Sequence, residues 1–329
     1  MALVGPVLIS GALLLVLAGL ALWAARRAVT RIETRFPPAA NFVTVAGTRL
    51  HLRQTGPRDQ PAILVLHGAA SNLEEPYLAL ADSLSGQHVI WLDRPGLGWS
   101  ERPDGDWDPQ REAALIAALL DELDCDRVTV VGHSWGGAIA MRLAMDHPGC
   151  VDSVVLVAPA LSAWIGDAAW FNAASFWPVL GPLITHLIVP LTGEAQARKG
   201  VVNAFHPEPV PEQYLDRSAL PLLLRPGTWR ANSTDMMKVN FHLEAQEDRY
   251  EDIEQPTEIL VARADTVLWS QRHGGMVAER MQRARLSWVS GAGHNLHHHH
   301  PDLVAKAVAR VRRRAGEATR KAAMTGPAA

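Results

Sequence analysis

The sequence is poor in cysteine: Cys125 and Cys150 are the only two in 329 residues. Two cysteines cannot form a disulfide framework or a four-cysteine zinc site. The chain also lacks a strong net charge, which is -3 at pH 7, and this gives no indication of a nucleic-acid partner. A hydrophobic content of 48% excludes a mainly disordered chain. The length suits one large α/β domain with an insertion, or two small domains.

Charge is absent altogether from Ala2 to Ala25, where most residues are Leu, Val, Ile or Ala. A helix rises about 1.5 Å per residue, so this run is long enough to cross a hydrocarbon core about 30 Å thick. A cleaved signal peptide normally begins with basic residues and has an apolar core of only about 7–15 residues. We therefore expect residues 1–25 to form a retained transmembrane anchor in the lipid bilayer.

Basic residues gather at the two ends of the remaining chain and leave an acidic body between them. Four arginines lie between residues 26 and 35, directly after the apolar run. Positively charged flanks stay in the cytoplasm, which predicts a single-pass protein whose body is cytoplasmic. Phe36-Pro37-Pro38 ends this stretch, and we expect residues 26–40 to form a stiff juxtamembrane linker.

Short apolar runs alternate with helical patterns along the body. The expected strands are a hairpin at 42–45 and 50–53, followed by buried strands at 62–66, 88–92, 128–131, 154–157, 258–261 and 286–289. Helical spacing is found at 75–84, 108–123, 138–145 and 301–311. This alternation predicts a doubly wound, mostly parallel α/β sheet.

One long interval, between the strands at 154–157 and 258–261, breaks the alternation. It is rich in Trp, Phe and Pro, and a structureless loop of this length is improbable in a compact domain. We expect a helical cap at 162–240, inserted into a core made of 41–161 and 241–311. The basic end of the chain, 312–329, is poor in apolar residues and is expected to be a flexible tail.

Gly132-His133-Ser134-Trp135-Gly136 follows an expected strand and opens an expected helix. This is the G-x-S-x-G pattern of a nucleophile elbow, in which the serine sits on a sharp, strained turn. Residues two positions away from such a serine must be small, because larger side chains would collide. Ser134 is therefore the candidate nucleophile.

A serine nucleophile needs a base that is oriented by an acid, and the expected chain order in this kind of sheet is Ser, then Asp or Glu, then His. Asp265 follows the strand at 258–261, and His294 follows the strand at 286–289. Both lie at carboxyl ends of parallel strands, where loops converge beside the elbow. We predict a triad of Ser134, Asp265 and His294.

An oxyanion hole needs two backbone N–H groups that point at the developing negative charge. The residue after the nucleophile, Trp135, supplies one of them. The other is expected from the loop after 62–66, where Gly68 permits a tight turn and Ala69 presents its N–H.

Taken together, these residues resemble the α/β-hydrolase superfamily over roughly residues 41–310. The motifs that carry the resemblance are His67-Gly68, Asp93-Arg94-Pro95-Gly96, Gly132 to Gly136, Asp265 and Gly293-His294. The resemblance implies Ser134 as nucleophile, Asp265 as acid, His294 as base, a lid over the site, and a structural role for the Asp93 turn. Epoxide hydrolases and haloalkane dehalogenases of this superfamily use an aspartate at the elbow, so Ser134 argues against both.

The sequence thus predicts a membrane-anchored serine hydrolase that acts on an apolar or aromatic small substrate. Acyl transfer to an alcohol or peroxide and hydrolysis of a carbon–carbon bond remain open, because they use the same triad. A tethered accessory protein without turnover remains open as well. We expect no metal ion and no organic cofactor. The run His297 to His300 lacks useful ligand spacing and is expected to be the entry to the last helix.

Overall fold

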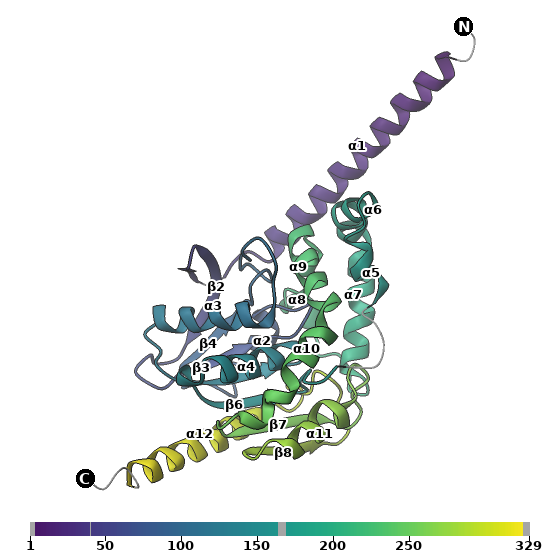
Figure 1. Ribbon diagram of the computed structural model, residues 1–329. Coiled ribbons are helices and arrows are strands. Elements are labelled where there is room, and N and C mark those ends of the chain that lie inside the picture. The colour runs from purple at the N-terminus through teal and green to yellow at the C-terminus, as the bar shows by residue number, and fades with distance from the viewer. Residues whose placement is uncertain (1–3, 40, 164–168, 325–329) are drawn as a thin grey trace.

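An eight-stranded sheet runs through the body of the protein in the computed structural model, which describes residues 4–39, 41–163 and 169–324 (Figure 1). The strand order is β1-β2-β4-β3-β5-β6-β7-β8. β1 pairs antiparallel with β2 and β2 with β4, whereas every other neighbouring pair is parallel. The predicted doubly wound, mostly parallel sheet is confirmed. The strands are β1 (Asn41–Val45), β2 (Thr48–Thr55), β3 (Ile63–Leu66), β4 (Val89–Leu92), β5 (Val128–His133), β6 (Val151–Val157), β7 (Thr257–Ala262) and β8 (Ala284–Val289).

Helices cover both faces of this sheet. Successive side chains of a strand point to opposite faces, so Leu64 and Leu66 of β3 pack in one core while Ile63 and Val65 pack in the other. The first core is closed by α3 (Pro109–Glu122) and α4 (Trp135–Asp146), and the second by α2 (Glu74–Leu80) and α12 (Pro301–Met324). Asp108 caps α3 by accepting the N–H of Arg111 at 2.8 Å.

The first helix, α1 (Val4–Arg35), is continuous over 32 residues and is long and apolar enough to cross a membrane. Residues 26–35 of the predicted juxtamembrane linker are helical and continue α1 without a break. Arginine is a good helix former, and no proline interrupts the helix between residue 26 and residue 37. Ala25 and Ala28 are buried, and Phe36 packs against Ala219 and Leu222. The end of α1 is thus docked on the body.

The last helix, α12, also extends further than expected. The predicted flexible tail is wrong for 312–324, which continues this helix, while 325–329 lie outside the described residues. The apolar stripe does not stop at Val311, since Ala315 is buried one turn later. Arg312 donates to the carbonyl of Pro61 and to the side chains of Gln87 and Thr129. The basic side chains bind the sheet and hold the helix in place.

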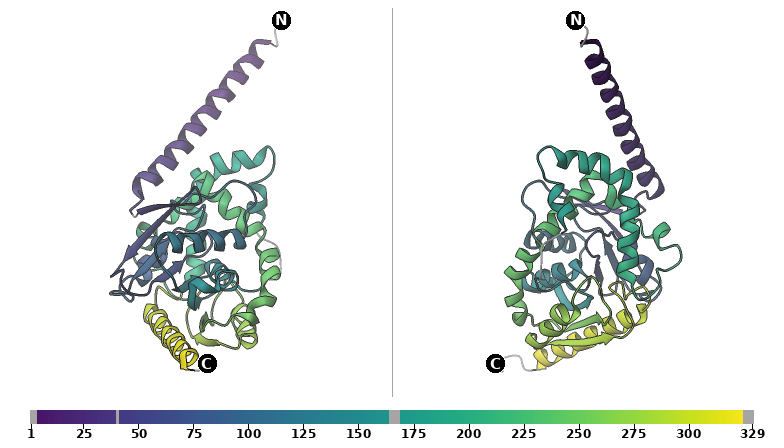
Figure 2. Two further views of the ribbon diagram at one scale, coloured as in Figure 1. Left: turned by 60° about the vertical axis from the view of Figure 1, so that its left-hand side comes forward. Right: turned by 90° about the vertical axis from the view of Figure 1, so that its right-hand side faces the viewer.

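Helices also fill the interval between β6 and β7 that the sequence predicts as a cap. They are α5 (Trp170–Ala174), α6 (Leu180–Leu183), η2 (Ile184–Ile188), α7 (Val189–Phe205), α8 (Tyr214–Arg217), η3 (Leu220–Leu224), α9 (Pro226–Met237), α10 (Val239–Glu247) and η4 (Asp248–Asp252). In both views of Figure 2 the teal helices at the start of this interval lie on the side of the body from which α1 departs. α1 contacts η2, α7 and η3.

Candidate active site

Ser134 lies on a strained turn between β5 and α4. Its backbone has φ 52° and ψ -120°, a conformation that side-chain-bearing residues rarely adopt. Three backbone hydrogen bonds hold it there: its N–H donates to Val157 at 3.1 Å, and its carbonyl accepts the N–H groups of Gly137 at 2.9 Å and Ala160 at 3.0 Å. The expected elbow geometry is present at this serine.

Glycine is required at positions 132 and 136, because a side chain at either position would collide with a neighbouring backbone oxygen. A Cβ on Gly132 would lie 2.6 Å from the carbonyl oxygen of Gly136, and a Cβ on Gly136 would lie 2.3 Å from that of Leu66. Both distances are far below van der Waals contact. The turn is therefore open only to glycine at these two positions, as the spacing predicts.

Asp265 and His294 meet at the carboxyl ends of β7 and β8. Nδ1 of His294 lies 2.8 Å from Oδ2 of Asp265, and the side chains of the histidine and the aspartate are 6% and 0% exposed. Oδ1 of Asp265 accepts the N–H groups of Val267 at 2.8 Å and Leu268 at 2.9 Å. Burial alone would raise the pKa of Asp265, but His294 and the two backbone donors lower it overall. The carboxylate is therefore ionised at neutral pH and orients the imidazole.

The loop that carries His294 lies directly beside the elbow. Nε2 of His133, the neighbour of Ser134, donates to the carbonyl of His294 at 3.3 Å, and the two imidazole rings are 5.0 Å apart. On the other side, a Cβ on Gly68 would lie 3.0 Å from Cβ of Ser134. The structure thus brings the elbow, the His294 loop and the loop after β3 together.

The two N–H groups predicted to form an oxyanion hole belong to Ala69, in the loop after β3, and to Trp135, which directly follows Ser134. Trp135 is the first residue of α4, so its N–H has no partner within the helix. In the parts of the chain that the structure describes, no hydrogen bond occupies the N–H of Ala69 or of Trp135. The next N–H, that of Ala70, donates to Oδ1 of Asn232 in α9 at 2.6 Å. Sequence reasoning missed Asn232, which lies 162 residues from Ala70 in the chain and belongs to no local motif.

A buried network of ion pairs and hydrogen bonds supports the loop after β3. Arg94 is fully buried and binds Glu112 through two hydrogen bonds of 2.7 and 3.1 Å, while Nη1 lies 3.4 Å from the carbonyl of Gly68. Its backbone N–H donates to Nε2 of His67 at 3.0 Å. Burial and the neighbouring Arg94 lower the pKa of His67 to about 4, so the imidazole is neutral and can accept this bond.

The Asp93 turn has the structural role that the resemblance implies. Oδ1 of Asp93 accepts the N–H of Leu73 at 2.7 Å. Oδ2 accepts from the N–H of Trp99 and from Nδ1 of His51, each at 2.7 Å. These bonds tie β2, β4 and the start of α2 together beside the site.

Two histidines of the run at 297–300 converge on a buried carboxylate. Oε1 of Glu75 lies 3.0 Å from Nε2 of His297 and 2.7 Å from Nε2 of His298. Burial would raise the pKa of Glu75, but the two histidines hold it well below its usual value. All three ligand atoms lie within 4.8 Å of one another, a spacing that can hold a metal ion. The prediction that the run lacks ligand spacing is therefore wrong for His297 and His298, while the run does lead into α12 as expected.

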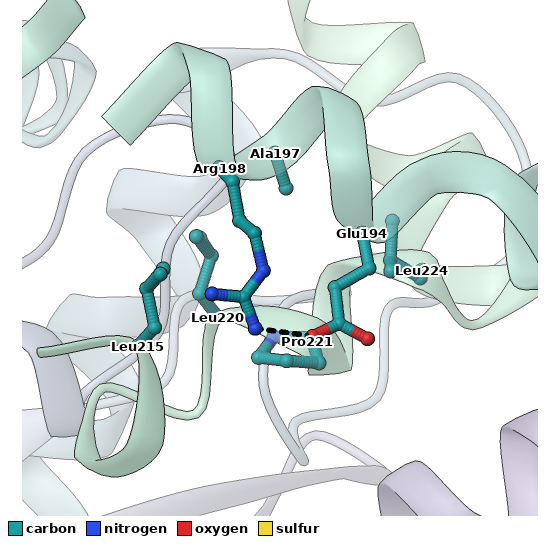
Figure 3. A pocket seen from close by; sticks show the side chains of 7 residues that line it. All are labelled: Glu194, Ala197, Arg198, Leu215, Leu220, Pro221 and Leu224. Carbon is teal, nitrogen blue, oxygen red and sulfur yellow. Dashed lines mark hydrogen bonds and ion pairs between the residues drawn. The ribbon is translucent and has the colours of Figure 1, made fainter. Parts of the chain in front are cut away.

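Two cavities lie away from Ser134. Figure 3 shows a hollow on the surface of the cap, spanned by the 2.9 Å ion pair of Arg198 with Glu194. Its volume of about 10 Å³ is too small for an organic substrate. Its other lining residues are Ala197, Leu215, Leu220, Pro221 and Leu224. A hollow of about 860 Å³ opens beside Cys125 and Thr129, at the opposite end of β5 from Ser134. Neither cavity is part of the candidate active site.

Comparison with known proteins gives a family match that includes all of these loops. A profile described as "Alpha/beta hydrolase family" matches residues 63–307. An uncharacterized protein of Mycobacterium tuberculosis is 39% identical over 121 residues, which make up 37% of this chain and 35% of the relative. The matched part thus spans about a third of such curated relatives. Other relatives include a haloalkane dehalogenase and an epoxide hydrolase.

Solved structures extend the likeness to most of the chain. The meta-cleavage product hydrolase of Pseudomonas fluorescens is 20% identical with a TM-score of 0.68, covering 84% of this chain and 98% of the hydrolase. A membrane phospholipase A is also 20% identical, with a TM-score of 0.64 over 95% of this chain and 98% of the phospholipase. At these identities the likeness shows a shared fold.

Proposed function

Because this chain belongs to the alpha/beta hydrolase family, we propose that it is a membrane-anchored serine hydrolase that cleaves an ester-type bond of an apolar or aromatic small substrate. The observation that carries the proposal is the 2.8 Å bond between His294 and Asp265, in a loop that lies against the strained turn of Ser134. A serine at the elbow distinguishes the chain from family members that use an aspartate there, such as the epoxide hydrolases and haloalkane dehalogenases.

In the proposed reaction Oγ of Ser134 attacks the carbonyl carbon of the ester while His294 takes the hydroxyl proton. The negative charge on the carbonyl oxygen is stabilised by the N–H groups of Ala69 and Trp135. His294 then returns its proton to the leaving alcohol, and the acyl group stays on Ser134. A water molecule, deprotonated by His294, releases the acid and restores the serine.

The membrane part of the proposal is supported by α1, whose segment Ala12–Arg35 contains an 18-residue stretch with a mean hydropathy of 1.8. The four arginines between residues 26 and 35 favour a cytoplasmic body. A reporter fused after Ala329 tests this orientation: a reporter that is active only in the cytoplasm should be active. Activity of a periplasmic reporter would refute the predicted side.

The chemistry is tested with the full chain in detergent and a fluorophosphonate probe, which reacts with activated serines. We expect labelling of the wild type and of the control Ser83→Ala, whose native hydroxyl donates to the carbonyl of Leu80. We expect no labelling of Ser134→Ala. Labelling that persists in Ser134→Ala would refute the assignment.

A panel of esters with increasing acyl length then measures substrate preference, and added alcohol or peroxide measures transfer to another acceptor. A folded wild-type protein that turns over no member of the panel would favour the accessory-protein alternative.

A further inference from the structure

The first half of the cap exposes an unusual amount of apolar surface. Residues 169–193 contain no Asp, Glu, Lys or Arg. Helices α5, α6, η2 and the start of α7 form this segment, and we call its exposed apolar side chains the cap face. Its most prominent members are Trp170, Trp177, Val179, Leu180, Leu183 and Ile188, with exposed fractions from 47% to 75%. Contiguous apolar patches of this kind mark interaction surfaces rather than ordinary protein surface.

The cap face lies next to the point where α1 leaves the body. Of the cap elements, η2, α7 and η3 contact α1. Ile32 of α1 and Phe36, which directly follows the helix, pack against Ala219 and Leu222 at η3. Ala25 and Ala28, which lie earlier in α1, are also buried, and η2 and α7 are the other cap elements that contact this helix. Figure 1 shows α6 on the side of the body from which α1 departs.

The contact between α1 and the cap sets the depth of the cap face relative to a bilayer that α1 would span. The charge-free run of α1 ends at Ala25, and the described residues 12–20 of α1 are exposed. If α1 spans a bilayer, Ala25 lies at the edge of the hydrocarbon core, since charged side chains follow at once. η2, which contacts α1 and carries Ile188 of the cap face, lies near the same edge.

The positive charges around the cap face are complementary to the anionic headgroups of a lipid surface. Arg26 and Arg27 are exposed at the end of the apolar run, and the guanidinium of Arg27 lies 5.2 Å from the ring of Trp23. Arg230, also exposed, lies 4.9 Å from the ring of Phe176 at the border of the cap face. Tryptophans at the boundary between apolar and basic residues are typical of the membrane–water interface, where arginines meet anionic headgroups.

We propose that the cap face inserts into the cytoplasmic leaflet beside α1, so that the cap is itself a membrane-binding element. The occupant is a phospholipid bilayer, and a second copy of the chain is the competing occupant. This inference rests on the proposed membrane anchor and not on the hydrolase chemistry. It favours a substrate that is dissolved in the bilayer over one that is dissolved in water.

Site-directed spin labelling of the full chain in vesicles of phosphatidylcholine and phosphatidylglycerol tests the proposal. After Cys125→Ser and Cys150→Ser, a nitroxide is attached to Leu180→Cys in the cap face. The matched control is Met276→Cys in α11 (Met276–Arg280), because the two native side chains are 50% and 51% exposed. A third label at Leu15→Cys, where the native residue is 76% exposed, reports on α1 itself.

The readout is the ratio of collisions with oxygen, which concentrates in lipid, to collisions with a water-soluble nickel chelate. We expect this ratio to be several-fold higher at positions 15 and 180 than at position 276. Equal ratios at positions 180 and 276, with a lipid value at position 15, would overturn the inference and leave the anchor standing. A water value at position 15 would overturn both. Spin–spin broadening at position 180 would also overturn the inference, because it would show a second copy on the cap face.

Discussion

Replacing Asp265 by asparagine should place the proton on the wrong nitrogen of His294. In the wild type, Oδ1 of Asp265 accepts two backbone N–H groups and Oδ2 faces Nδ1 of His294. The amide of asparagine has one oxygen and one NH₂ group. Its oxygen should stay with the two backbone donors, because an NH₂ group there would meet two N–H groups at 2.8 and 2.9 Å.

The NH₂ group of the introduced asparagine would then point at Nδ1 of His294, which must accept rather than donate. The imidazole proton moves to Nε2, the nitrogen that should take the proton of Ser134. The corresponding change in serine proteases preserves geometry and lowers kcat about 10⁴-fold, equivalent to about 5.5 kcal/mol of barrier. We expect a loss of the same order in this chain, with little change in KM.

The assay is steady-state hydrolysis of a p-nitrophenyl ester by the detergent-solubilised wild type and by Asp265→Asn, with thermal unfolding measured on the same samples. Asp248→Asn is the matched control, because the side chain of Asp248 is 91% exposed in its pair with Arg280. It should keep wild-type kcat. A kcat for Asp265→Asn within tenfold of the wild type, in a protein that melts normally, would refute the role assigned to this carboxylate.

Three further predictions concern the scaffold. Gly136→Ala should prevent labelling by fluorophosphonate, because its Cβ would lie 2.3 Å from a backbone oxygen. The control Gly200→Ala has nothing within 4 Å of its Cβ, and its free energy of unfolding, measured with a chemical denaturant, should rise by up to about 1 kcal/mol. Glu112→Ala should cost about 3–5 kcal/mol in the same assay because it leaves Arg94 buried without its main partner, and the double change Arg94→Met/Glu112→Leu should cost less. The pKa of Glu75 is lower in the folded protein than in the unfolded chain, so its contribution to stability is full above about pH 4.3 and is lost as the pH falls further. The difference in Tm between wild type and Glu75→Gln should therefore shrink on acidification below that pH, and a constant difference would contradict the pKa direction.

Much of the sheet and of the elbow could be predicted from the sequence because their signals are local. Buried strands such as β3 and β5 are short apolar runs, and their flanking glycines mark the turns. Ser134 can be identified from the residues within two positions of it in the sequence. Asp265 and His294 lie far apart in the chain, but each directly follows a strand, and the parallel sheet brings such positions to one edge.

The features that sequence analysis missed depend on residues distant in the chain, which no local pattern can identify. Asn232 becomes important only because α9 brings it to the N–H of Ala70. Glu75 is an ordinary helix residue until α12 and the turn before it place His297 and His298 against it. The basic, apolar-poor composition of 312–329 predicts a flexible tail, but Arg312 forms hydrogen bonds with Pro61, Gln87 and Thr129 that composition cannot reveal.

The end of α1 is joined to the body by hydrogen bonds rather than by a flexible linker. Nε1 of Trp99 donates to the carbonyl of Phe36, at the end of α1, at 3.1 Å. The backbone N–H of the same Trp99 donates to Asp93, which also accepts the N–H of Leu73 after the Gly68–Ala69 loop. A flexible linker would let the body turn freely beneath a membrane. A helix fixed through these bonds allows few orientations of the body relative to α1, and each of them keeps η2 and α7, which contact α1, beside the segment that we propose spans the membrane. The same bonds reach Leu73, which follows the loop expected to hold the oxyanion, so the end of α1 and this loop share one hydrogen-bonded support.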